Sequence, residues 1–152
     1  MIKLALYQPD IPQNVGAAMR LCACLGVSLE IIEPCGFVWD ERKIRQAGMD
    51  YIDKVALSRH GSWTQFLEAN PDRRIVLMTT KADLSYTNFA FQDGDTLLAG
   101  RESAGVPDDI HDYANARIAI PMKNGLRSLN IVNAAAMVMG EALRQTGSLD
   151  KL

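Results

Sequence analysis

The sequence predicts an α/β fold in which a mostly parallel sheet carries helices on both faces. Short apolar segments typical of strands alternate along the chain with segments of helical periodicity, which is the pattern of a parallel sheet. One of these segments, Ile75–Met78, is apolar throughout, as a buried strand would be. The 152 residues include 48% apolar side chains and no linker or repeat, so we expect one domain over residues 1–152.

Six short segments are expected to form strands, because each is mainly apolar and is bounded by proline, glycine or polar residues. They are Ile2–Tyr7, Ser28–Ile32, Val55–Leu57, Ile75–Met78, Thr96–Ala99 and Arg117–Ile120. The third of them is the weakest. Residues 82–95 show neither strand nor helix periodicity, and Asp93-Gly94 marks a turn within them.

Helices are expected between these strands, where cap residues and periodic apolar positions coincide. Asn14 is the expected N-cap of a helix over Val15–Leu25, which Gly26 closes. Gly16 inside this helix indicates close approach by another backbone or by a ligand. The other expected helices before the last are Asp40–Ala47, a helix that Ser62 caps and that ends before Pro71, and a short helix after Pro107.

The segment from Ile118 to Gln145 contains a strand end, a polar loop and the final helix. This helix is apolar on nearly all sides from Ala134 to Met139, so it lies deep in the core or its outer face is covered by another subunit. Ser128 is its expected N-cap. Polar side chains gather where the helix offers free N–H groups and a partial positive charge, which indicates a ligand site. They are Arg127, Ser128, Asn130 and Asn133.

The loops after the later strands should meet at one edge of the sheet. In open parallel sheets the ligand lies beyond the carboxyl ends of the strands. Three such ends are Met78-Thr79, Gly100–Glu102 and Ile120–Met122. We expect these three loops to converge with the start of the final helix.

Composition excludes several classes of function. The net charge of −2 argues against a general polyanion binder, so a nucleic-acid partner needs a local basic patch. The densest candidate holds Arg42, Lys43 and Arg45 and is either an RNA-facing edge or solvated surface. The three cysteines suit a reducing cytoplasm, and with only two histidines we expect no metal site. No apolar run approaches the ~20 residues of a membrane span, and we expect no signal peptide.

Arg20 and Glu102 are the charged residues whose surroundings point most clearly to chemistry. Arg20 is the only charged side chain in residues 11–29, so its guanidinium should meet a carboxylate, a phosphate or an open cleft. A structural ion pair is the plain alternative. Glu102 stands between Gly100 and Gly105, in what is either a ligand-binding loop or an ordinary tight turn.

The common nucleotide and hydrolase motifs are absent. Ser103 lacks the Gly-x-Ser-x-Gly spacing of a hydrolase, and there is neither a Gly-x-Gly-x-x-Gly motif nor a Walker A lysine. Gln8–Gln13, after the first strand, is a poor phosphate loop because it contains two prolines and an aspartate. This disfavours a nucleotide-binding protein of flavodoxin-like type.

Three sequence blocks together resemble the SPOUT class of RNA methyltransferases. The first is Asn14-x-Gly16-x-x-x-Arg20, preceded by YQPDIPQN; the second is LAGRESAGVP, residues 98–107; the third is IPM, residues 120–122, followed by RSLNIVN and EALRQ. The small size and the stretch IIEPCGFVWDERKIRQAGMDY further resemble the TrmL (YibK-like) group of tRNA wobble-position ribose methyltransferases. The resemblance covers nearly the whole chain in register.

The resemblance implies an α/β fold with a deep trefoil knot near its C-terminal end, S-adenosyl-L-methionine as the cofactor and an obligate homodimer. The implied activity is methylation of the ribose 2′-hydroxyl of cytidine or uridine 34 in the anticodon loop of tRNA, with tRNA-Leu-type substrates. Another tRNA or rRNA ribose, or a non-catalytic RNA-binding role, remains an alternative. Carried over by position, the cofactor residues are Met78, Thr79, Gly100, Glu102, Ile120, Met122 and Ser128.

The same positions give candidates for catalysis and RNA binding. Arg20 is expected to hold the target ribose and phosphate, while a phosphate or Glu102 assists proton removal, because a guanidinium is very hard to deprotonate. The catalytic candidates are Asn14, Arg20, Glu102 and Asn133, and the RNA-binding candidates are Arg42, Lys43, Arg45 and Arg127.

Two positions depart from the family pattern. Arg101 stands where proline is common, and we expect it to loosen the loop or to add a phosphate contact. Val132 stands where serine is usual and removes a hydroxyl from the site. Any role of that serine is therefore absent in this chain.

Overall fold

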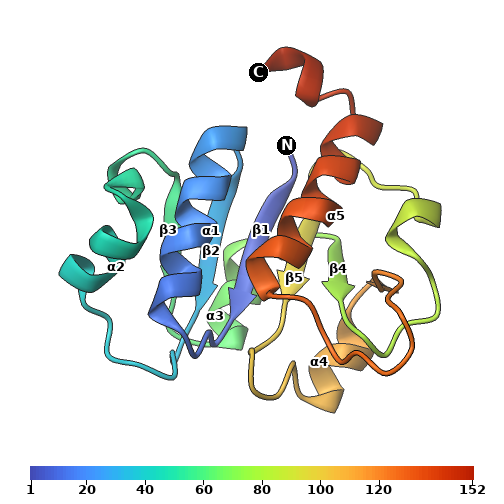
Figure 1. Ribbon diagram of the computed structural model, residues 1–152, viewed down its shortest axis with the longest axis horizontal. Helices are drawn as coiled ribbons and strands as arrows, with labels where there is room; N and C mark the ends of the chain where they lie inside the picture. Colours follow the sequence, from blue (N-terminus) through green and yellow to red (C-terminus); the bar gives the residue numbers. More distant parts are fainter.

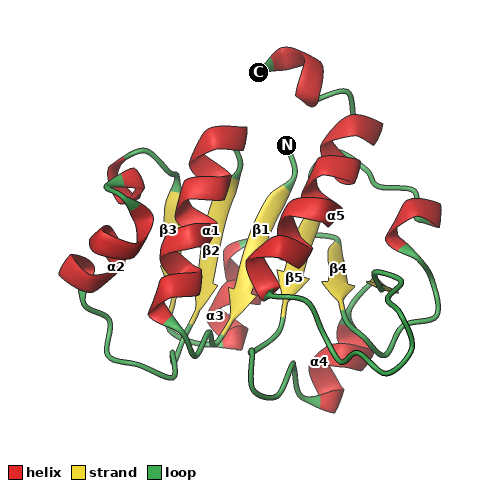
Figure 2. Ribbon diagram, in the orientation of Figure 1, coloured by secondary structure: helices red, strands yellow, loops and turns green.

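The computed structural model describes all 152 residues. At its centre is a six-stranded sheet in which every neighbouring pair of strands is parallel (Figures 1 and 2). The spatial order is β3-β2-β1-β5-β4-β6. The strands are β1 (Lys3–Tyr7), β2 (Ser28–Ile32), β3 (Leu57–His60), β4 (Ile75–Met78), β5 (Thr96–Ala99) and β6 (Ala116–Ile118). The predicted α/β class with a parallel sheet is confirmed.

Helices cover both faces of the sheet, as the sequence predicts (Figure 1). On one face lie α1 (Pro12–Leu25), α2 (Glu41–Gly48) and α5 (Ile131–Gln145), and on the other lie α3 (Trp63–Ala69) and α4 (Asp108–Tyr113). Three short 3-10 helices, Tyr51–Asp53, Tyr86–Asn88 and Leu149–Lys151, complete the secondary structure.

Alternate residues of the central strand β1 divide between two apolar cores. Leu4 and Leu6 pack on the side of α1 and α5, whereas Ala5 and Tyr7 pack on the side of α3 and α4. This central parallel strand is thus buried on both faces, and its residues 4–7 are apolar throughout. This property made the central strands recognisable in the sequence.

At the edges of the sheet the strands differ from the prediction. β3 lies at Leu57–His60 rather than Val55–Leu57, because an edge strand needs no continuous apolar run, and its Ser58 and Arg59 are exposed. β6 begins one residue earlier than expected and ends two residues earlier. Its end is set by Ala119, which pairs instead with Ser85 in an isolated bridge.

Two of the expected N-caps are wrong. Helix α1 already begins at Pro12, whose fixed φ suits the first helical turn, so Asn14 lies inside that turn. Helix α5 is capped by Asn130 rather than Ser128, because the Asn130 side chain accepts hydrogen bonds from the second and third backbone N–H groups of the helix. The expected ends that are confirmed are Gly26 after α1 and Ser62 before α3.

Gly16 is explained by helix packing. A Cβ atom at this position would lie 2.6 Å from the Cβ atom of Ala47 and 2.7 Å from the backbone nitrogen of Gly48. Helices α1 and α2 therefore approach backbone to backbone, which glycine alone permits. The sequence left open whether Gly16 is approached by another backbone or by a ligand, and the structure shows that it is the backbone of α2.

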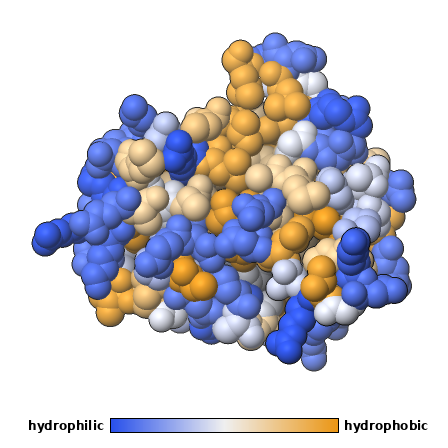
Figure 3. Space-filling view, viewed as in Figure 1, coloured by the Kyte–Doolittle hydropathy of each residue, from blue (hydrophilic) through white to orange (hydrophobic).

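Helix α5 is buried on one side and exposed on the other. Val138 and Met139 are buried in the core, whereas Asn133 is exposed and Met137 is 43% exposed. Apolar side chains gather on the molecular surface around this helix (Figure 3). Complete burial of α5 within its own chain is thus excluded. None of the helices has the length and apolar character that crossing a bilayer requires.

Candidate functional site

A cavity of about 620 Å³ lies at the carboxyl ends of β4, β5 and β6, beside the first turn of α5. Its volume and its mixture of apolar and polar walls are typical of a small-molecule site. The loops that follow the three strands converge there, as expected for a parallel sheet. Every residue predicted to hold the cofactor lines it: Met78, Thr79, Gly100, Glu102, Ile120, Met122 and Ser128.

The Gly100–Gly105 loop at one wall of this cavity is tightly folded. A Cβ atom at Gly100 would lie 2.6 Å from the carbonyl carbon of Gly105, so only glycine fits. The backbone N–H of Arg101 donates to the Gly105 carbonyl at 2.8 Å, and the Gly105 N–H donates back at 2.9 Å. Proline at position 101 has no N–H to donate. The expectation that Arg101 loosens this loop is therefore wrong.

Glu102 is held at the cavity by two donors. The backbone N–H of Asp10 donates to Glu102 Oε2 at 2.7 Å, and Asn14 Nδ2 donates to Glu102 Oε1 at 3.1 Å. The Asn14 side chain in turn accepts a bond from Asn130 Nδ2 at 3.2 Å. Asn130 Oδ1 accepts from the backbone N–H of Val132 at 2.9 Å. A continuous chain of hydrogen bonds thus runs from the loop after β5 to the start of α5.

Asp10 fastens the loop after β1 to the Gly100–Gly105 loop. Arg101 makes an ion pair with Asp10 Oδ1, and the backbone N–H of Ser103 donates to Asp10 Oδ2 at 3.1 Å. Hydrogen bonds from Arg101 and then from Ser103 lower the pKa of Asp10 to about 2. Because the guanidinium of Arg101 is engaged with this carboxylate, it does not offer the free phosphate contact that was the other expectation for it.

Arg20 lies outside the cavity, on the exposed side of α1. Its Nη1 donates to the sulfur of Met49 at 2.9 Å, and its guanidinium lies 5.6 Å from the centre of the Tyr51 ring. No carboxylate pairs with it in this structure. The structural ion pair, the plain alternative for this residue, is thus not found.

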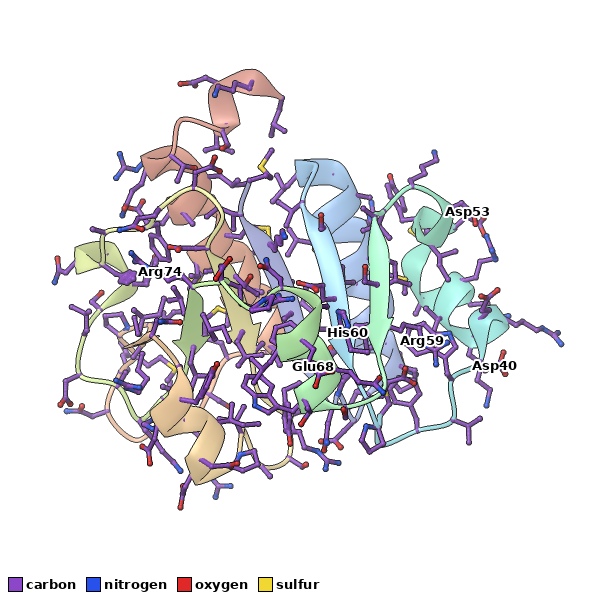
Figure 4. All side chains as sticks on the ribbon, turned by 180° about the vertical axis from the view of Figure 1, so that it is seen from behind. Asp40, Asp53, Arg59, His60, Glu68 and Arg74 are labelled. Atoms are coloured by element: carbon purple, nitrogen blue, oxygen red, sulfur yellow. The ribbon has the colours of Figure 1, made fainter.

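The candidate RNA-binding residues lie in two separate places. Arg42 and Lys43 are exposed at the start of α2, which Asp40 caps, whereas Arg45 pairs with Asp53 (Figure 4, which labels both aspartates). Arg127 lines a second hollow of about 400 Å³, which adjoins the main cavity. The second hollow shares Thr80, Ala119, Ile120 and Met122 with the main cavity and also contains Lys123.

Three residues of the site were not singled out from the sequence: Lys81, Asp108 and His111 line the cavity with charged or titratable groups. Asn130 was predicted as part of the polar cluster, and it joins the site by donating to Asn14. Asn133, predicted to be catalytic, is exposed on α5 and is bonded through its backbone to the Asn130 cap. The cap pattern before an apolar helix was the signal that could have assigned the N-cap to Asn130.

Comparison with known proteins gives a coherent result. The SpoU rRNA Methylase family matches residues 1–140. A protein of Beijerinckia indica subsp. indica named tRNA (cytidine(34)-2′-O)-methyltransferase is 59% identical over 151 residues, which span 98% of this chain and 94% of that protein.

Solved structures agree with the sequence comparison. One described as giving structural insights into the 2-OH methylation of C/U34 on tRNA superimposes with a TM-score of 0.90 at 39% identity, covering 95% of each chain. The SpoU methyltransferase AviRb of Streptomyces viridochromogenes, in complex with AdoMet, has a TM-score of 0.83 at 24% identity and shares the fold; the match covers 95% of this chain and 60% of that one.

These comparisons confirm the resemblance to RNA methyltransferases that the three sequence blocks carry. The family match takes in the first turn of α1 with Asn14 and the Gly100–Gly105 loop, and it extends into α5. Sequence, fold and site geometry agree, and the chain belongs to the SpoU rRNA Methylase family.

Proposed function

We propose that this protein transfers a methyl group from S-adenosyl-L-methionine to the ribose 2′-hydroxyl of nucleotide 34, cytidine or uridine, in the anticodon loop of tRNA. The observation that carries the proposal is the 59% identity, over 98% of the chain, to a tRNA (cytidine(34)-2′-O)-methyltransferase. A tRNA-Leu-type substrate and a cytoplasmic location are part of the same proposal.

The cavity suits the proposed cofactor. Apolar side chains such as Ile118, Ile120 and Val138 can enclose an adenine ring, and Gly100 lines the same cavity. Lys81 and Asp108 can hold the carboxylate and the ammonium group of an amino acid. The bound cofactor would supply a methyl group on a positively charged sulfur, and the carboxylate of Glu102 is a matching negative charge.

The ribose hydroxyl is a poor nucleophile, so the protein must align it and accept its proton. We propose that Glu102 and Asn14 form the polar wall against which the nucleotide is aligned, because their side chains are already oriented by hydrogen bonds. Arg20 then holds the RNA phosphate and ribose. Both oxygens of Glu102 already accept a hydrogen bond from the protein, so we propose an RNA phosphate rather than Glu102 as the proton acceptor.

A homodimer is part of the proposal. The exposed side of α5 offers Met137 to a second subunit, although Val138 and Met139 are buried in their own chain and contribute nothing to such an interface. A dimer also allows basic residues of two subunits to line one RNA-binding surface. Arg42, Lys43, Arg45 and Arg127 are our candidates for that surface, with Asn133 beside the interface.

We further propose that the C-terminal segment forms the trefoil knot implied by the family resemblance. The support is local: Ile118 accepts a backbone bond from Thr79, and Ala119 is bonded to Leu84 and Tyr86. The end of β6 is thus flanked by the two ends of the 79–86 loop. Such an arrangement is what a chain passing through a loop requires.

The test is mass spectrometry of tRNA nucleosides after incubation of purified protein with S-adenosyl-L-methionine and tRNA. We expect a 2′-O-methylated nucleotide at position 34 and no product with rRNA. Methylation of rRNA alone would reassign the substrate, and binding of tRNA without methylation would indicate a non-catalytic RNA-binding factor. Calorimetry with FMN or ATP should show no binding in the cavity.

A further inference from the structure

The peptide group between Pro9 and Asp10 is bonded at both of its polar atoms. The Pro9 carbonyl accepts from the backbone N–H of Gly36 at 2.9 Å, and the Asp10 N–H donates to Glu102 at 2.7 Å. Gly36 follows β2, while Glu102 follows β5. The orientation of this peptide group therefore depends on the loops after β1, β2 and β5. That orientation sets the position of the N–H group that donates to Glu102.

The Asp10 side chain also helps to fix this peptide group, because its carboxylate is bonded to the Gly100–Gly105 loop. Arg101 Nε donates to Asp10 Oδ1 at 3.2 Å, one of its terminal nitrogens bonds the same oxygen, and Nη1 reaches Gln8 Oε1 at 3.5 Å. Ser103 bonds the other carboxylate oxygen. These contacts join residues 91 to 93 positions apart in the chain.

Charge makes Arg101 the necessary member of this group. The carboxylates of Asp10 and Glu102 belong to the same group of contacts, and like charges that lie near each other repel. Arg101 is the only cation that forms an ion pair with either of them. Removing its charge should push Asp10 away from Glu102 and turn the N–H that holds Glu102.

We propose that Arg101 is a positioning residue for methyl transfer: through Asp10 it fixes the N–H that holds Glu102, and through Glu102 it orients the amide of Asn14 at the cavity. The inference rests on the proposed function. The Arg101 side chain bonds Asp10 and Gln8 and makes no hydrogen bond to Glu102 or Asn14, so its guanidinium acts on those two side chains through Asp10.

The experiment compares R101Q, R101K and the matched control R74Q. Arg74 makes an ion pair with Asp95 at 3.2 Å, and its side chain is 29% exposed, against 32% for Arg101. Arg74 is labelled in Figure 4 and directly precedes the amino end of β4, whereas the cavity lies at the carboxyl end of that strand. Rates are measured with tRNA, cofactor affinity by calorimetry and stability by thermal unfolding.

We expect R101Q to lower kcat about ten- to hundredfold, because a displacement of ~1 Å at a reacting group has effects of this size. Arg101 lines the cavity, but its guanidinium is bonded to Asp10, so the Kd for S-adenosyl-L-methionine should stay within about threefold of wild type. R101K should recover part of kcat by keeping the charge beside Asp10. R74Q should retain wild-type kcat.

A second measurement does not depend on turnover. The side-chain amide signal of Asn14 in a nitrogen-15 spectrum, assigned with N14A, should shift in R101Q and stay in place in R74Q. An unshifted signal, a wild-type kcat in R101Q, or a loss of kcat that R74Q shares would each overturn the inference. Failure of the proposed function is different, since the wild-type protein itself would then methylate no tRNA.

Discussion

The direction of the hydrogen bonds around Glu102 gives a sharp prediction for E102Q. Glu102 accepts two bonds, whereas glutamine of the same shape offers one acceptor and one donor. The Asp10 N–H needs the acceptor, so the new NH₂ group faces the NH₂ group of Asn14. Asn14 cannot simply turn over, because its oxygen already accepts from Asn130. Asn130 cannot turn over either, because its own oxygen caps α5.

One bond is therefore lost whichever amide adjusts. A hydrogen bond to a charged group contributes about 1.5–3 kcal/mol when buried, and this site is partly exposed, so we expect E102Q to lower the free energy of unfolding by about 1–2 kcal/mol. N14D should do at least as much harm, since it sets two carboxylates against each other.

The double variant E102Q/N14D should recover most of that loss. Its aspartate accepts from both the new glutamine and Asn130, and the net charge equals that of the wild type. Urea unfolding at a fixed protein concentration gives the four free energies of this double-mutant cycle. Simple addition of the two single losses would refute the directional chain of bonds. Recovered stability without recovered turnover would show that the Glu102 charge itself is needed for methyl transfer.

The remaining predictions concern Arg20, Met137 and Asp10. R20A should abolish methylation in the tRNA assay while leaving calorimetric binding of S-adenosyl-L-methionine unchanged; retained turnover would contradict the role proposed for Arg20. M137E should place a charge on the exposed side of α5 and shift sedimentation from dimer toward monomer, and an unaltered dimer would move the interface elsewhere. The pKa of Asp10 is lowered from 3.8 to about 2 in the folded chain, so its ionised form stabilises the fold above pH 3.8 and this contribution is lost as the pH falls toward 2. D10N should show no such contribution in the same acid window, and acid unfolding of both proteins followed by circular dichroism compares them.

The sequence predicted those parts of the fold that leave a local pattern. β1, β4 and β5 are buried on both faces, and their continuous apolar runs gave correct or nearly correct bounds. β3 is an edge strand with exposed Ser58 and Arg59, so its sequence has no such run, and the prediction missed its position. Helix α1 begins at Pro12 rather than at Val15, because proline is favoured in the first helical turn, and Asn14 is therefore not the N-cap.

The cavity could be predicted because parallel strands end at one edge, which brings Met78, Gly100 and Ile120 together without knowledge of any distant contact. The pairing of Arg101 with Asp10 could not, because 91 residues separate them and neither shows a local signal of the other. Asn133 was placed by family position, and only the structure reveals that Asn130 is the amide bonded to Asn14. The resemblance identified the site, and the structure shows the hydrogen bonds that connect its residues.

Asn130 has two tasks that cannot be separated. Its oxygen closes the first turn of α5, and its nitrogen holds the oxygen of Asn14. Order in the first turn of the helix and order at the cavity are therefore one local equilibrium rather than two. A ligand that favours the bonded arrangement of Asn14 will also slow hydrogen exchange at the amides of Val132 and Asn133. Hydrogen exchange at the beginning of α5 therefore reports whether the hydrogen bonds of the site are formed.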